Sequence, residues 1–182
     1  KVYDETGDRL TPSRSKKSSG RVIRYYYSNR LISGGTDPTG WRLRADMLEQ
    51  LLSEIVVTRL TEALTQFRLA PQIKPHALVE AKKRLEKLDT KAILDLIKQV
   101  DLRETTARIE LNIDKVSSLI QIEISKLDLE LLRIEEPVTL RKRTNGTKLT
   151  WVGYKGEPNH ALIRAIVTAQ AWVEEIKAGQ SV

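Results

Sequence analysis

Cationic and aromatic side chains are interleaved near the start of the chain, in a pattern suited to binding a polyanion. Residues 21–28 combine two arginines with three consecutive tyrosines, and the polar stretch before them carries more lysines and arginines. Long cationic side chains bind phosphate oxygens, and neighbouring hydroxyls add hydrogen bonds to the same groups. The candidate nucleic-acid contacts in this region are Arg14, Lys16, Lys17, Arg21, Arg24, Tyr25, Tyr27 and Arg30.

The tyrosines of this region have two possible roles. An extended strand places Tyr25 and Tyr27 on one face and Tyr26 on the other, so at least one ring is expected in the core. The alternative interpretation of the whole region is a solvated basic hairpin with structural tyrosines. The spacing of the residues alone leaves both interpretations open.

A second basic strand lies near the other end of the chain. Arg141, Lys142 and Arg143 fall in a stretch that contains no acidic residue between Val138 and Gly156. These three cations are further candidate nucleic-acid contacts. The alternative is a solvated strand edge, since lysines commonly protect exposed edges from pairing.

The net charge of the chain is concentrated at its start. The 182 residues include 31 lysines and arginines and 24 acids, a net charge of +7. Residues 1–44 hold ten cations and four acids, whereas the remaining 138 residues hold 21 cations and 20 acids. A local excess of this kind favours a polyanionic partner, either nucleic acid or an anionic membrane.

Other kinds of site find little support in the sequence. The chain has no cysteine, and its two histidines, His76 and His160, are far apart, so we expect neither a metal site nor a thiol nucleophile. Glu174 and Glu175 suit a solvated helix face better than an acid–base pair across a cleft. There is no phosphate loop or nucleophile elbow, and no apolar run as long as a membrane span. We therefore expect no catalytic residue, cofactor, membrane span or small-molecule substrate, and the order of the motifs described below favours nucleic acid over a membrane as the partner.

The elements that position these residues predict an α+β fold. It comprises a small basic antiparallel β-unit, a helical middle segment, and then an antiparallel sheet with a C-terminal helix. The predicted domains are residues 1–43, 44–100 and 101–182. The first contains a strong β-branched and aromatic strand at 21–28, preceded by a loop tip at 18–20.

The middle segment is predicted to contain three helices. Apolar residues over 45–67 follow the i, i+3, i+4 spacing of an amphipathic helix. Pro75 suits the first turn of a second helix, over 75–88. The Asp89-Thr90 pair then caps a third helix over 91–100.

The third segment is predicted to form a four-stranded, largely antiparallel sheet followed by a helix. The first two strands alternate apolar and polar residues around a turn at 112–117. The last two flank Asn145-Gly146, the strongest short hairpin signal. A closing amphipathic helix is expected over about 159–177. The predicted strands are 107–113, 119–124, 138–143 and 147–152.

Several motifs occur in the order found in a known family. Together they resemble the recombinase zinc β-ribbon region and the C-terminal region of the large serine recombinases, relatives of the resolvases and invertases. The least specific part is the middle of the chain. The motifs that carry the resemblance are 4–13, the lysine pair 16–17, 24–28, Gly40-Trp41-Arg42-Leu43, 137–143, 158–166, Trp172 and 179–182.

This resemblance implies a DNA-binding C-terminal portion of a site-specific recombinase from a phage or mobile element. It would hold double-stranded DNA at the recombination site in the bacterial cytoplasm, alongside other recombinase subunits. The family's catalytic domain, which cleaves and exchanges strands, lies N-terminal to this region and is expected to be absent from this piece of a longer protein. Zinc ribbons hold their metal on cysteines, so the resemblance implies a metal-free version here.

Two other functions remain open on the sequence. One is an RNA-binding module in which Tyr25 or Tyr27 stacks on splayed bases. The other is a non-catalytic assembly domain whose amphipathic helices bind a protein partner. Preference for single strands would favour the first, and a stable oligomer without nucleic-acid affinity would favour the second.

Overall fold

One curved β-sheet runs through the part of the chain that the structure describes. This computed structural model describes residues 1–16, 18, 20–33, 39–143 and 146–152, and for 141–143 and 146–148 it describes the backbone. The described strands form one eight-stranded sheet in the order β1-β5-β6-β7-β8-β4-β3-β2. They are β1 (Val2–Tyr3), β2 (Leu10–Lys16), β3 (Val22–Ser28), β4 (Arg42–Arg44), β5 (Ile97–Leu102), β6 (Thr106–Leu111), β7 (Arg133–Arg143) and β8 (Gly146–Trp151).

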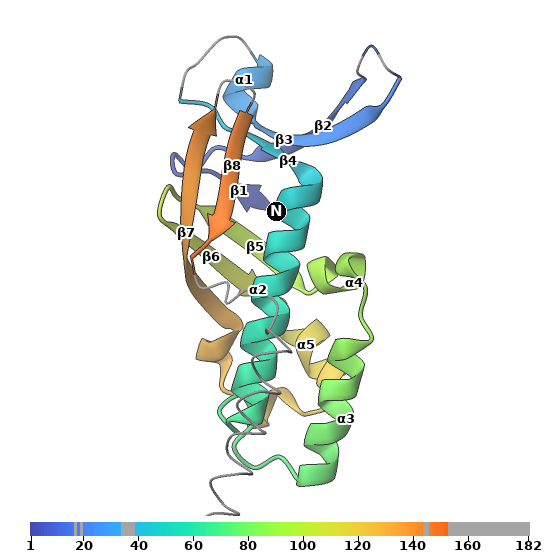
Figure 1. Cartoon of the computed structure of the whole chain (residues 1–182). Helices are drawn as coiled ribbons and strands as arrows, with labels where there is room; N and C mark the ends of the chain where they lie inside the picture. Colours follow the sequence, from blue (N-terminus) through green and yellow to red (C-terminus); the bar gives the residue numbers. More distant parts are fainter. Residues whose placement is uncertain (17, 19, 34–38, 144–145, 153–182) are drawn as a thin grey trace, which may run out of the picture. The chain divides into compact units, whose positions relative to one another are not determined.

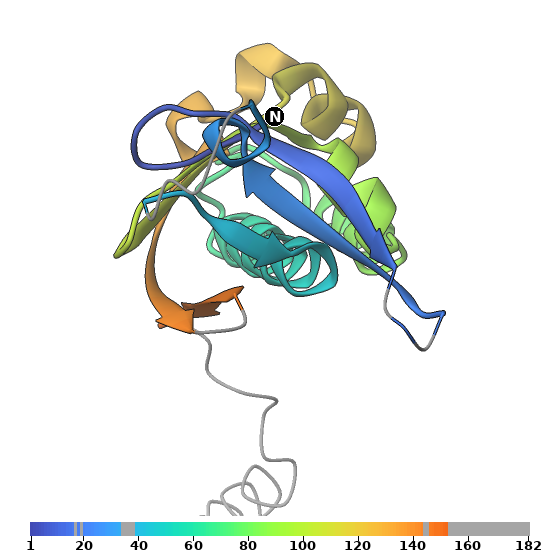
Figure 2. The same ribbon diagram turned by 90° about the horizontal axis from the view of Figure 1, so that it is seen from above.

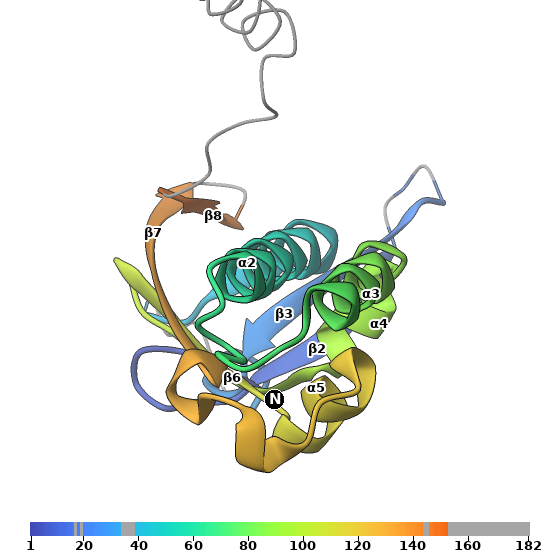
Figure 3. The same cartoon turned by 90° about the horizontal axis from the view of Figure 1, so that it is seen from below.

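The long strand β7 bends the sheet by changing partners along its length. Its first half pairs with β6 and its second half with β8, both antiparallel. The β1–β5 and β4–β8 pairs are parallel. An isolated bridge between Tyr3 and Arg9 joins the two ends of the sheet, so the sheet curls toward closure. Figures 2 and 3 show the strands arranged around one long helix, α2 (Ala45–Thr65).

Helices cover the side of α2 that the sheet leaves open. Helix α2 contributes buried side chains along its length, among them Leu48, Ile55 and Leu64. Helices α3 and α4 lie beside it (Figure 1), which places its apolar stripe at the centre of the core. The other described helical elements are α1 (Asn29–Ser33), α3 (Pro75–Glu86), α4 (Thr90–Asp95), α5 (Ile113–Ile120), η1 (Ile124–Lys126) and η2 (Leu129–Leu132).

The starts of three helices follow from local chemistry. Pro75 occupies the first turn of α3, where its missing N–H costs no hydrogen bond. The Asp89 carboxylate accepts a 2.7 Å hydrogen bond from the Ala92 amide and begins α4. Asn112 caps α5 in the same way, through the Lys115 amide. The predicted starts of the second and third helices are therefore confirmed.

The α+β fold class is confirmed, and the sheet crosses the predicted domain boundaries. Strands β1 to β4 come from residues 1–44, and β5 to β8 come from residues beyond 96. The parallel β4–β8 pair joins the two groups, with Leu43 opposite Thr147. Residues Lys1–Val152 accordingly group into one compact unit.

Two predicted elements in this region are wrong. The third helix ends at Asp95 rather than 100, because residues 97–102 pair with strands on both sides as β5. The predicted strand at 119–124 does not form. Asn112 caps a helix there, and the four-residue spacing of Val116 and Ile120 buries both side chains.

The predicted four-stranded sheet is corrected to the eight-stranded one, although its last hairpin is confirmed. Strands β7 and β8 pair antiparallel from Val138↔Trp151 to Arg143↔Gly146, which brackets the predicted turn. The closing helix predicted at 159–177 lies outside the described residues.

Candidate nucleic-acid interface

The hairpin of β2 and β3 carries most of the predicted cationic residues. We call residues 10–28 the arm; its two strands pair continuously from Leu10↔Ser28 to Lys16↔Val22. Gly20, with φ +79°, lies in the connection between them, a conformation that glycine adopts without strain. Figures 1 and 2 show the end of β2 and the start of β3 extending past the start of α2, away from the rest of the sheet.

The register of the arm places cation opposite cation. Arg14 stands directly across from Arg24, and Lys16 is two positions further along the same face. Like charges directly opposite each other destabilise a strand pair. Arg14, Lys16 and Arg21 are exposed, and within the described residues none of them forms an ion pair. Lys17 lies outside the described residues.

Glu49 of α2 is an acid that pairs with a cation of the arm. Its carboxylate accepts a 2.7 Å hydrogen bond from Arg24 Nη2 and a 3.2 Å bond from the Tyr26 hydroxyl. The Arg24 side chain remains 54% exposed, so this pair is open to solvent. Burial and the adjacent Glu49 raise the pKa of Tyr26. Glu49 thus neutralises one arm cation and ties the root of β3 to the helix.

The three tyrosines divide between the two faces of β3. Tyr26 faces α2 and packs against the core. Tyr25 and Tyr27 lie on the other face with their ring centroids 5.9 Å apart. Tyr25 is only 8% exposed, and Tyr27 is partly buried. Tyr25 is therefore not positioned to stack on a base.

Arg30 is held in a polar network at the base of the arm. Its Nη1 donates to the buried Asp4 carboxylate at 2.6 Å and to Asp8 at 3.2 Å, and its Nη2 donates to the Thr39 carbonyl at 2.9 Å. Asp4 also accepts hydrogen bonds from Ser28 and from the Thr6 and Asp8 amides. These contacts give Arg30 a structural role that spacing in the sequence did not indicate.

The Asp4 carboxylate is ionised more readily than an ordinary aspartate. Burial alone would raise its pKa, but hydrogen bonds from Ser28, Thr6 and Arg30 outweigh that effect, and its pKa lies below the usual value. An ionised, fully bonded Asp4 connects the loop after β1 to the end of β3. The network therefore fixes the root from which the arm extends.

The second basic strand joins the same sheet as the arm. In the backbone register, Arg141 pairs with Lys148 and Arg143 with Gly146, with Lys142 between them. The side chains of 141–143 lie outside the described part of the structure. Strand β8 pairs with β4, which pairs with β3, so the two predicted basic regions belong to one continuous run of strands.

A buried carboxylate fixes this second strand to α2. Glu136 is 3% exposed, lies where β7 changes partners, and accepts hydrogen bonds from both Arg59 and Trp151 Nε1. The bond to Glu136 and a further one to Glu62 raise the pKa of Arg59 despite partial burial. This contact holds β7 and β8 against the same helix that carries Glu49.

One residue near the arm was missed in the sequence. Arg42 begins β4, and its guanidinium carbon lies 4.3 Å from the ring centroid of Tyr25 and 5.5 Å from that of Tyr27. In the sequence this position belongs to a short motif leading into a helix. A three-residue strand carries too few residues to show a periodic signal.

Other kinds of site are not found within the described residues. No group of histidine, cysteine or acidic side chains there is placed to hold a metal ion, and His76 is exposed on α3. No helix in those ranges is both long and apolar enough to span a bilayer. His160 lies outside them.

Comparison with known proteins provides no relative. No family model matches the chain, and no curated protein or solved structure is significantly similar to it.

Proposed function

We propose that this chain is a DNA-binding part of a site-specific serine recombinase and that the arm contacts duplex DNA. The observation that carries the proposal is the register of the arm, which aligns Arg14 with Arg24 and leaves three exposed cations without an internal acid. A protein accepts such repulsion more readily where an external polyanion relieves it. The order of the sequence motifs supports the recombinase family.

The role proposed for this part is to hold the recombination site, with Arg141, Lys142 and Arg143 as a second contact. Cleavage and strand exchange are assigned to a catalytic domain outside the sequence, so no residue here receives a catalytic role. In the parent protein, other recombinase subunits are the expected partners. Because Tyr25 is buried and the Arg42 guanidinium lies over the rings of both Tyr25 and Tyr27, duplex binding is better supported than base stacking on single strands.

The test is a titration of a fluorescently labelled duplex at salt concentrations from about 50 to 400 mM. We compare the wild type with a triple variant of the arm, Arg14→Gln, Lys16→Gln and Arg21→Gln. If all three side chains touch phosphate, the slope of log K against log salt becomes shallower by about 2.7. At about 0.1 M salt that corresponds to a loss of roughly 500-fold in affinity.

A matched control removes the same number of charges elsewhere on the sheet. Lys98→Gln, Arg108→Gln and Arg133→Gln lie on β5, β6 and β7, and we expect this variant to keep the wild-type slope. If both triple variants lost the same affinity for the duplex, binding would depend on the net charge of the protein alone. That result would contradict an interface on the arm. A flat salt response of the wild type, or tighter binding to single-stranded RNA, would overturn the proposal.

A further inference from the structure

In the part of the chain that the structure describes, Arg42 is a partly buried arginine without an acidic partner, unlike three other arginines around the arm. Arg24 pairs with Glu49, Arg30 with Asp4, and Arg44 with Asp46. Within the described residues, the Arg42 side chain forms neither a hydrogen bond nor an ion pair, and its Nε is buried without an acceptor. Its described contacts are the two tyrosine rings.

An arginine in this state destabilises the fold unless a group outside the chain accepts its hydrogen bonds. A partly buried cation loses hydration, and each buried N–H without an acceptor adds a desolvation penalty. Cation–π contacts recover part of that cost and fix the plane of the guanidinium. They satisfy none of its N–H donors, and because Nε is buried, an anion would approach through the terminal Nη groups.

The surroundings of Arg42 suit an anion with several oxygens. In the register, Arg42 stands beside Tyr27, and Tyr27 stands beside Thr11 of β2. Tyr25 stands between Arg44 and Ser13 in the same way. Alternation along the strands therefore gives hydroxyl-bearing and cationic positions to one face. The planar fork of arginine matches the paired oxygens of a phosphate group.

We propose that Arg42, held by Tyr25 and Tyr27, binds a phosphate group. Given the proposed function, the source of that phosphate is the DNA backbone, and this part of the inference rests on that function. The site lies on the opposite face of the sheet from Arg14 and Arg24, since Arg24 and Tyr26 both reach Glu49 on α2. Arg42 therefore provides a phosphate contact separate from those of the arm cations.

The first experiment detects the site without DNA. Inorganic phosphate is titrated into the protein while the arginine Nε–Hε signals are followed by NMR. We assign the Arg42 signal by its loss in Arg42→Lys, and we use Arg103, an exposed arginine outside the arm, as the internal control. A saturable shift of the Arg42 signal that exceeds that of Arg103 supports the site. Equal, non-saturating shifts of the two signals overturn it.

The second experiment identifies the source of the phosphate. Arg42→Met keeps an apolar stem over the tyrosine rings but removes the charge, and Arg103→Met is its matched control. For duplex binding we expect Arg42→Met to make the salt slope shallower by about 0.9, whereas Arg103→Met leaves the slope unchanged. Compared with Arg42→Met, Arg42→Lys should recover part of the lost salt slope. It should recover less of the lost affinity, because lysine lacks the planar fork of arginine.

These two experiments separate the site from the proposed function. If phosphate shifts the Arg42 signal saturably but the protein does not bind duplex DNA, Arg42 is a site for small phosphates. That result would overturn the DNA proposal. Duplex binding with an unchanged slope in Arg42→Met would keep the function and overturn the Arg42 inference. A lower unfolding temperature of Arg42→Met with unchanged phosphate and DNA binding would show that the stack is structural only. If Arg42→Met does not fold, the wild-type phosphate titration decides.

Discussion

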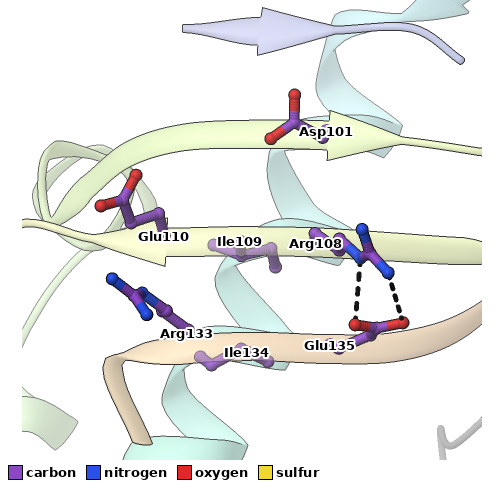
Figure 4. Close-up of a pocket in the computed structure, with 7 residues that line it drawn as sticks. All are labelled: Asp101, Arg108, Ile109, Glu110, Arg133, Ile134 and Glu135. Atoms are coloured by element: carbon purple, nitrogen blue, oxygen red, sulfur yellow. Dashed lines mark hydrogen bonds and ion pairs between the residues drawn. The ribbon is translucent and has the colours of Figure 1, made fainter. Parts of the chain in front are cut away.

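In two regions of the same sheet, the arginines have opposite electrostatic surroundings. In the arm, Arg14 stands across from Arg24. On the outer face of β5, β6 and β7, Arg108 stands between Asp101 and Glu135 and donates to Glu135 at 3.0 and 3.4 Å. We call this second surface the balanced face; Figure 4 shows its side chains around a shallow pocket of about 330 Å³.

Strand register, rather than amino-acid composition, determines which region pairs its cations with acids. On the balanced face, Arg133 stands opposite Glu110 and forms an ion pair with Glu130, and Glu110 accepts a 2.8 Å hydrogen bond from Lys98. Each cation there has an acid on a neighbouring strand or turn, so the face offers no single sign of charge to a polyanion. In the arm, Glu49 is the acid with a described contact to a cation of the strands. Under the proposed function, we expect DNA contacts from arginines that the fold leaves without a carboxylate.

The largest expected effect comes from breaking the buried carboxylate contact of β7. Glu136→Gln leaves Arg59 facing a neutral partner and weakens its bond, and removing one partner of a buried pair is strongly destabilising. Because Arg59 is 39% exposed and can reach solvent, we expect a loss near the lower limit, about 3 kcal/mol. Urea unfolding measures it, with the exposed Glu130→Gln as the control. Equal stability of the two variants would show that Glu136 does not anchor β7.

The next effect concerns the polar network at the root of the arm. Asp4→Asn should lower the free energy of unfolding at neutral pH by about 2 kcal/mol, because the charged acceptor of Arg30 and Ser28 is lost. The depressed pKa of Asp4 means that its contribution is complete above its unfolded pKa of about 3.9. It is then lost as the pH falls through the lower, folded pKa.

The pH dependence gives this second prediction its control. The stability difference between wild type and Asp4→Asn should be constant from neutral pH to about pH 4 and should shrink below it. Glu5→Gln, in the same turn and exposed, should show no such difference. A difference that persists at low pH would mean that packing, rather than the charge of Asp4, stabilises the root of the arm.

Much of the local structure could be predicted from the sequence. The β-branched and aromatic run of β3, the apolar spacing of α2, Pro75 and Asp89 each determine an element through residues that are close together in the chain. The wrong predictions concern segments whose structure depends on pairing with residues far away in the sequence. Residues 97–102 form a strand only because β1 and β6 lie on either side.

The candidate site shows the same limit. Arg30 looked like one more cation of a basic region, because its partner Asp4 is separated from it by the whole arm and meets it only in the fold. Arg24 and Glu49 are a second pair of this kind. Arg42 could not be recognised for a different reason: only the fold brings its guanidinium over the rings of Tyr25 and Tyr27.

A smaller effect should follow from removing Glu49, which pairs with a cation of the arm. Glu49→Gln frees Arg24 from its pair, so the arm gains one available cation. We expect the salt slope of duplex binding to steepen by about 0.9 and the affinity at about 0.1 M salt to rise by up to roughly 8-fold. Glu54→Gln, also on α2, changes the net charge equally and should change the salt slope and the affinity much less. An equal gain from both variants would contradict a specific role for Arg24.

The smallest effect is expected on the balanced face. Arg108 and Glu135 are about half exposed, and exposed pairs contribute at most about 1 kcal/mol, so Arg108→Gln should leave the unfolding midpoint almost unchanged. The same variant should bind the duplex with the wild-type salt slope, because the acids that remain on this face repel phosphate. Anisotropy titrations of Arg108→Gln beside Arg14→Gln make the comparison direct, since both remove one exposed arginine from a strand. If the slope became shallower by about 0.9 in both, an acid on the next strand would not keep an arginine from DNA, and register would lose its value as a guide to the interface.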